Sequence, residues 1–143
     1  MARDKVLAAC AVIPGLLIAA IPLLAHHGRA GAYDSRKPVT STATVANVTY
    51  ANPHVQLYFD TKDAQGKVTH WSGEMTDIGQ LTRAGWTRKR FMDALKTGTT
   101  VSVTYQASTF PQPAGQGVAL VMKITDEKGE PIGLVRRGAG GQE

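Results

Sequence analysis

Residues 55–75 read VQLYFDTKDAQGKVTHWSGEM, and this stretch decides the fold. Over 55–61 every second residue is apolar, which predicts a strand with one buried and one polar face. The sequence at 63–66, Asp-Ala-Gln-Gly, is typical of a type I turn with glycine in the last position. The alternation resumes over 67–75 and places Trp71 on the apolar phase. The stretch therefore predicts a β-hairpin with Trp71 in the core.

The segment before this hairpin predicts a bent strand. Its apolar residues keep one phase from Val39 to Val45 and change phase near Ala46, and such a change indicates a bulge. Ala51-Asn52-Pro53 then ends the strand, because proline has no N–H to donate and restricts the residue before it. We expect a first strand that changes its buried face near Ala46.

After the hairpin the pattern becomes helical. Asp77 can cap a short helix, and Gly85 is placed to end it in a left-handed conformation. Thr87 can cap a second helical turn, in which Phe91 and Leu95 are four residues apart and share a face. The sequence therefore predicts a short helical segment between two groups of strands.

The last part of the chain returns to β structure. A turn at 96–99 leads into a strand with apolar residues at 101, 103 and 105. Residues 108–117 contain two prolines and two glycines and predict a long flexible loop. The strand at 118–125 is apolar on both phases early on, so we expect it to lie centrally in the sheet.

The order strand, strand, strand, helix, strand, strand predicts an all-β domain with one short helical segment. It is the order of a small five-stranded OB-like barrel, and the alternative is an antiparallel sheet with a helix packed on one face. We place the boundaries of the chain as follows: signal peptide 1–25, N-terminal arm 26–38, barrel 39–125 and flexible C-terminal tail 126–143.

The start of the chain has the three-part organisation of a secretory signal peptide. Met1–Lys5 is positively charged, Val6–Leu24 is apolar, and Ala25 is small. We expect cleavage after Ala25, with Ala32 as the alternative; an uncleaved anchor is the competing interpretation, but its prolines would interrupt a spanning helix. The protein is therefore predicted to be periplasmic or secreted and to meet the membrane only through its signal peptide during export.

Charge and cysteine content exclude several functions. The chain has 16 Lys and Arg against 11 Asp and Glu, a net charge of +5, which falls short of a dedicated nucleic-acid binder. Arg83 and Arg88-Lys89-Arg90 form a basic cluster that we interpret as a solvated helix face. Cys10 is the only cysteine and lies in the signal peptide, so the mature chain has no disulfide and no thiolate. No catalytic motif is visible, and we predict neither an enzyme nor a nucleic-acid partner.

The polar face of the hairpin is the first candidate site. If the apolar faces of the two strands align, the opposite face collects His54, Gln56, Tyr58, His70, Ser72 and Glu74. Strand pairing then places His54 beside Glu74 or one pair away. On an OB barrel this face is the usual ligand surface, although an outward face can be polar simply because water covers it. The candidate ligand face comprises Asn52, Tyr58, His70 and Glu74.

A second candidate site depends on cleavage after Ala25. The mature chain would then begin with His26, whose free α-amine and imidazole can chelate one metal ion. An imidazole from His27 or His54 would complete an all-nitrogen site suited to Cu(II). The arrangement resembles the histidine brace of periplasmic copper proteins; alternatively, the two histidines are only a tolerated N-terminus in a disordered arm.

The chain also resembles a bacterial family of small exported proteins known as domain of unknown function, family 6152. The residues that carry the resemblance are Ala25-His26-His27, Tyr33-Asp34, Lys37, Asn52-Pro53-His54, Trp71, Glu74, Leu81 and Gly85-Trp86. The similarity covers roughly residues 25–125. It implies export and supplies no activity, and Gly28-Arg29 departs from the serine and aromatic residue that are common in the family.

Two functions follow from the sequence. The first is an exported binding module for a metal ion, Cu(II), or a small ligand, with His26, His27 and His54 as metal ligands. The alternative is a non-catalytic accessory or structural protein that binds another exported protein through the barrel face.

Overall fold

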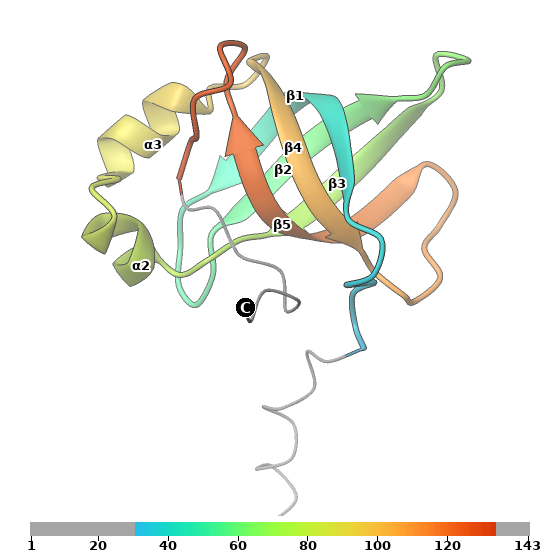
Figure 1. Cartoon of the computed structure of the whole chain (residues 1–143), viewed down its shortest axis with the longest axis horizontal. Coiled ribbons are helices and arrows are strands. Elements are labelled where there is room, and N and C mark those ends of the chain that lie inside the picture. Colours follow the sequence, from blue (N-terminus) through green and yellow to red (C-terminus); the bar gives the residue numbers. More distant parts are fainter. Residues whose placement is uncertain (1–30, 134–143) are drawn as a thin grey trace, which may run out of the picture. The chain divides into compact units, whose positions relative to one another are not determined.

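Five strands and two short helices make up the part of the chain that the computed structural model describes, residues 31–133. In chain order these elements are β1 (Val39–Thr49), β2 (Gln56–Lys62), β3 (Val68–Glu74), α2 (Ile78–Arg83), α3 (Arg88–Ala94), β4 (Thr100–Ala107) and β5 (Gln116–Thr125). Figure 1 shows the strands curling around one another, with both helices at one end of the barrel. The predicted order of elements is confirmed, and the helical segment contains the two helical turns that Asp77 and Thr87 were expected to cap.

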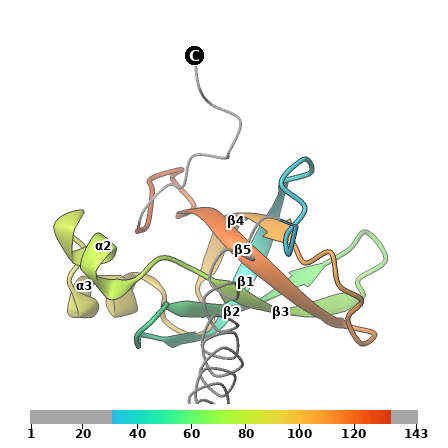
Figure 2. The same ribbon diagram turned by 90° about the horizontal axis from the view of Figure 1, so that it is seen from below.

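The strands close into a barrel in the order β1-β2-β3-β5-β4. β1 pairs with β4 as well as with β2, and β3 pairs with β5 as the one parallel pair among the described strands. Figure 2 shows β5 lying along β3 on the side away from the helices. This is the closure expected of an OB-like barrel, and β5 is flanked on both sides, as its apolar sequence predicts.

The first strand changes its buried face at the predicted position. The register of β1 against β2 shifts between Val45 and Asn47, so Ala46 is the extra residue of a bulge. Val45 is buried before the shift and Val48 after it. The bulge therefore lets β1 bend around the barrel while both of its halves contribute to the core.

Each of the two helices begins at a capping residue that the sequence predicted. Asp77 caps α2, and its side chain accepts a hydrogen bond from the backbone N–H of Gln80 at 2.9 Å. This bond is the main reason that the pKa of Asp77 lies below its ordinary value. Thr87 caps α3 in the same way through the N–H of Arg90, and Gly85 separates the helices at a φ of +81°.

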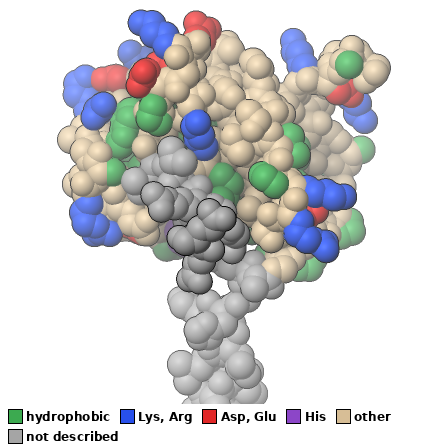
Figure 3. All heavy atoms as spheres, in the orientation of Figure 1, with side chains coloured by type: hydrophobic (Ala, Val, Ile, Leu, Met, Phe, Trp, Pro, Cys, Tyr) green, Lys and Arg blue, Asp and Glu red, His purple; other side chains and the backbone are tan. Residues whose placement is uncertain are grey.

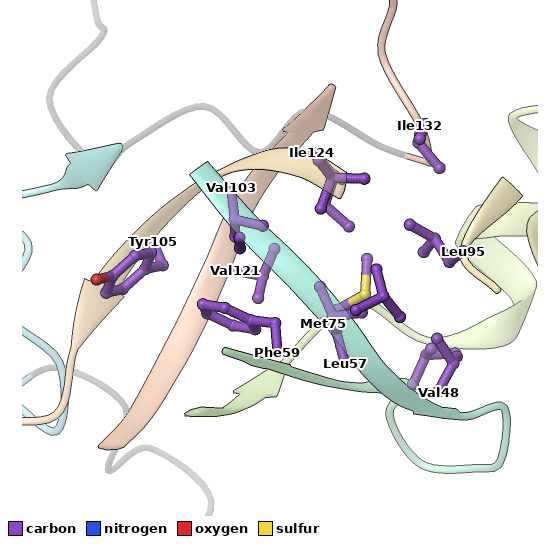
Figure 4. Packing of buried hydrophobic residues seen from close by; sticks show 14 of the residues in the cluster. Val48, Leu57, Phe59, Met75, Leu95, Val103, Tyr105, Val121, Ile124 and Ile132 are labelled. Carbon is purple, nitrogen blue, oxygen red and sulfur yellow. The ribbon is translucent and has the colours of Figure 1, made fainter. Parts of the chain in front are cut away.

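The core runs from the barrel interior to the helices. It includes Leu57 and Phe59 from the hairpin, and Leu81, Phe91 and Leu95 from the helical segment. Figure 4 shows buried side chains from several strands lying close together inside the barrel. The helices therefore close one end of the barrel with apolar side chains.

The predicted position of Trp71 needs a correction. Its ring packs against Phe59 and Tyr105 of the core, but the residue is only partly buried. Its indole N–H donates to Thr61 Oγ1 at 3.0 Å. The ring lies directly against Gly117, where an added Cβ would come within 2.3 Å of the ring atom Cε3. The glycine therefore makes room for the tryptophan between β3 and β5.

The chain beyond β5 turns back on the barrel. The sequence places residues from Asp126 onward in a flexible tail, but the N–H of Ile132 donates to the carbonyl of Ile124 at 2.9 Å, and Ile132 is buried in the core. Residues 134–143 lie outside the described part, as do the predicted signal peptide and both arm histidines. Within residues 31–133, neither helix has the length and apolar character needed to cross a membrane.

Candidate functional site

The polar face of the hairpin is part of a wider outer surface. Strand pairing sets its outward residues in three rows that each cross β1, β2, β3 and β5: Thr44, Asp60, His70, Gln116; Asn47, Tyr58, Ser72, Val118; and Thr49, Gln56, Glu74, Leu120. We call this surface the barrel face. The alternation of side chains in each strand places these residues outside and the apolar core inside.

One histidine–carboxylate pair lies at the edge of the barrel face near the β1–β2 loop. His54 precedes β2, and its Nδ1 lies 3.4 Å from Oε1 of Glu74. The predicted neighbourhood of these two residues is confirmed. Both side chains are partly shielded, with exposed fractions of 31% for His54 and 19% for Glu74. Asn52, which we grouped with them, is exposed in the loop and is joined to Pro53 by a cis peptide bond.

A tyrosine from the N-terminal arm joins this pair. The hydroxyl of Tyr33 donates to Oε2 of Glu74 at 3.2 Å, so the two carboxylate oxygens face different residues. The arm is held there by backbone contacts: Tyr33 forms a bridge with Ser108, and the N–H of Asp34 donates to the carbonyl of Ala107 at 2.9 Å. Tyr33, His54 and Glu74, hereafter the arm cluster, therefore come from three separate segments.

The residue that our reading of the sequence missed is Tyr33. It lies in a segment without strand or helix periodicity, so alternation gives no information about it. The only signal was its place in the family resemblance, where Tyr33-Asp34 follows the histidine pair.

A second histidine–carboxylate pair lies two rows away on the barrel face. His70 and Asp60 are direct partners across the β2–β3 ladder, and His70 Nδ1 lies 2.7 Å from Asp60 Oδ1. The histidine is 68% exposed, which is much more than His54. Tyr58 and Ser72 form the row between the two pairs. The structure therefore divides the predicted ligand face into two separate groups.

The described residues do not form a complete metal site by themselves. Across residues 31–133 no group of three or more His, Cys, Asp or Glu side chains is placed to hold one ion. His54 and Glu74 provide two of the usual donors, and the phenol oxygen of Tyr33 lies beside them. His26 and His27, the other predicted ligands, lie outside the described residues.

Residues of the basic cluster form an ion pair and a cation–π contact with neighbouring side chains of the helical segment. Lys89 pairs with Asp93, and this contact lowers the pKa of Asp93 and raises that of Lys89. The guanidinium of Arg90 lies 4.1 Å above the ring of Trp86. Figure 3 shows the basic side chains on this side of the molecule mixed with acidic ones. These contacts agree with the predicted solvated helix face.

Fold and barrel face together define a small closed-barrel protein with a polar outer surface of the kind that OB-like barrels use for ligands. More particularly, the chain belongs to a family of unknown function, DUF6152, whose model matches residues 13–117. The match includes the arm cluster and ends as β5 begins. No curated protein and no solved structure shows significant similarity to the chain.

Proposed function

We propose that this protein is an exported, non-catalytic binding module that holds a Cu(II) ion where its N-terminal arm meets the barrel face. His26 supplies its α-amine and imidazole after signal cleavage, and His27 or His54 supplies a further imidazole. The observation that carries the proposal is the contact between Tyr33 and Glu74, because it ties the arm to the carboxylate that His54 faces.

The length of the arm supports this assignment. His26 lies seven residues before Tyr33. An extended chain spans at most about 3.5 Å per residue, so the α-amine of His26 can reach points within roughly 24 Å of Tyr33. His54 lies well inside this radius, since it and the Tyr33 hydroxyl both contact the carboxylate of Glu74.

The orientation of His54 also suits a metal ligand. Its Nδ1 faces Glu74, which leaves Nε2 as the nitrogen that would coordinate the ion. Histidines that bind metals commonly donate their other ring N–H to a carboxylate, because this fixes the tautomer and the ring orientation. Glu74 would then act by holding His54, while nitrogen atoms bind the Cu(II).

Calorimetric titration with Cu(II) tests the proposal on four forms of the exported protein. These are the protein starting at His26, the same protein with one glycine before His26, and the variants His54→Ala and His70→Ala. The added glycine converts the chelating amine into an amide, and we expect it to lower the Cu(II) affinity by about 100-fold or more. His54→Ala should lower the Cu(II) affinity by about tenfold. His70→Ala is the matched control and should bind as the parent protein does.

Metal binding requires deprotonated nitrogen ligands, so Cu(II) affinity should fall as the pH is lowered. Equal affinity with and without the added glycine would contradict the amine-chelated site. An intact mass showing that export leaves residues 1–25 attached, or removes the chain up to Ala32, would also overturn it.

The alternative function is that of an accessory protein that binds another exported protein. Phe110 supports it, since this large apolar side chain is 65% exposed in the β4–β5 loop next to the barrel face. Unchanged Cu(II) binding in all variants would favour this alternative over the copper site.

A further inference from the structure

A groove of about 480 Å³ lies on the barrel face, and no residue of the arm cluster lines it. The groove lies between the β2–β3 hairpin and the β4–β5 loop. In both ribbon views the β4–β5 loop runs beside β3 (Figures 1 and 2). The backbone fixes this position, because the N–H of His70 donates to the carbonyl of Gly115 at 2.9 Å. Its volume falls within the range of small-molecule sites, and neither His54 nor Glu74 lines it.

The groove is lined by three aromatic residues and by a set of mixed hydrogen-bonding groups. The aromatic residues are Tyr58, Phe59 and Trp71, and the polar ones are Asp60, His70, Ser72, Gln112 and Gln116. The groups are partly fixed in advance: Asp60 orients the ring of His70, and the side-chain amide of Gln112 donates to the carbonyl of Phe110 at 3.1 Å. Amide, hydroxyl, imidazole and carboxylate groups can together both donate and accept.

The charge of the lining excludes one class of ligand. Asp60 contributes a carboxylate, and no Lys or Arg is among the lining residues that the structure describes. Binding of nucleic acid depends on neutralising phosphates with basic side chains, so this groove is unsuited to a polyanion although Tyr58 offers a ring for stacking.

The same lining matches a sugar. Every sugar hydroxyl both donates and accepts hydrogen bonds, which fits the mixed groups of the groove. The C–H groups on one face of a sugar ring carry partial positive charge and pack on the negative face of an aromatic ring. From this chemistry we propose that the groove binds a short neutral oligosaccharide, with one sugar ring on Tyr58 and hydroxyls bonded to Asp60, His70 and the two glutamines.

The proposal is tested by NMR titration of the exported protein in the presence of EDTA, which removes any metal. The probes are maltotetraose, cellotetraose and chitotetraose, with a single-stranded oligothymidylate for comparison. We expect at least one oligosaccharide to shift the amide resonances of β2, β3 and residues 112–116, and the oligothymidylate to leave them unchanged.

Variants assign the shifts to the groove. Tyr58→Ala should weaken binding by about tenfold or more, whereas Tyr58→Phe keeps the ring and should bind nearly as well as the parent. Gln112→Ala, in the loop and outside every strand, should also weaken binding without risk to the fold. Gln56→Ala is the matched control, since Gln56 lies on the barrel face but outside the groove lining.

Three outcomes would overturn the proposal: no shift with any of the three oligosaccharides, shifts with the oligothymidylate instead, or parent-like affinity in both Tyr58→Ala and Gln112→Ala. The result is independent of the copper site. His54→Ala should bind sugar normally, and Tyr58→Ala should bind Cu(II) normally.

Discussion

The two histidine–carboxylate pairs of the barrel face are built in different ways. His70 and Asp60 face each other across one ladder at 2.7 Å, and His70 is well exposed. His54 and Glu74 are 3.4 Å apart and both more shielded than His70, and Tyr33 from the arm contacts Glu74. The first pair needs only the register of a hairpin. The second brings together residues from three segments. Strand register alone therefore accounts for the more exposed pair, whereas the more shielded pair also depends on the arm and on the loop before β2.

The largest expected effect concerns Trp71, which follows His70 in β3 and packs on the core. Trp71→Ala should lower the free energy of unfolding by about 3 kcal/mol, because it removes a large side chain that packs on the core. His70→Ala, one residue earlier and outward, should cost less than about 0.5 kcal/mol. Chemical denaturation measures both. Similar losses would mean that the two faces of β3 are assigned wrongly.

Gly117→Ala tests the same contact from β5. The added Cβ would lie within 2.3 Å of the Trp71 ring, so we expect a loss of about 2–3 kcal/mol through overpacking. Combined with Trp71→Ala it should cost less than the two single losses added together, since the clash disappears with the ring. Additive losses would show that the glycine serves another purpose.

A smaller effect separates the two carboxylates. Glu74→Gln should lower the free energy of unfolding by about 1 kcal/mol, because this shielded carboxylate contacts both Tyr33 and His54. Asp60→Asn should change it by less than about 0.5 kcal/mol, since its pair is exposed and screened by water. Urea denaturation at neutral pH compares them, and equal losses would remove the distinction between the pairs.

The hold on the arm can be measured without changing the pairs themselves. Tyr33→Phe removes only the hydroxyl that contacts Glu74, which should release the arm and speed tryptic cleavage after Arg36 by about fivefold, as the loss of one hydrogen bond implies. Tyr58→Phe is the control and should leave the rate unchanged. A rate unaffected by Tyr33→Phe would show that backbone contacts alone hold the arm.

The smallest expected effect concerns the acid sensitivity of the cap of α2, away from both pairs. The pKa of Asp77 is lowered in the folded chain, chiefly by the N–H of Gln80, so its contribution to stability is present above the unfolded pKa and is lost as the pH falls through the folded pKa. Asp77→Asn should show a shallower decline of the urea midpoint at acid pH. Identical declines would mean that this cap contributes no acid sensitivity.

The fold was largely predictable because its signals are local. The phase change at Ala46, the turn at 63–66 and the caps Asp77 and Thr87 each depend on a few adjacent residues, and all four are present. The burial of Ile132 was not predictable, because it depends on the chain turning back to pair with β5, and the sequence after β5 has no periodicity that indicates such a turn.

The candidate site was predictable only in part, for a related reason. Alternation shows that His54, His70 and Glu74 share a face, and the register of the hairpin identifies the residues opposite them on the neighbouring strand. It does not show what covers that face. Tyr33 reaches Glu74 from a distant, irregular segment, and the groove exists because the β4–β5 loop passes beside β3.

The closure of the barrel has a consequence for how the chain folds. Val39 pairs with Tyr105, and Trp71 pairs with Gly117, so both β1 and β3 obtain a second partner only from the last third of the chain. Such distant contacts must overcome a large loop-closure entropy, which slows folding. Until β4 and β5 are available, β1 and β3 present open edges that can pair with other chains. The barrel therefore gains protection against aggregation in its final step, when the complete set of strands is present.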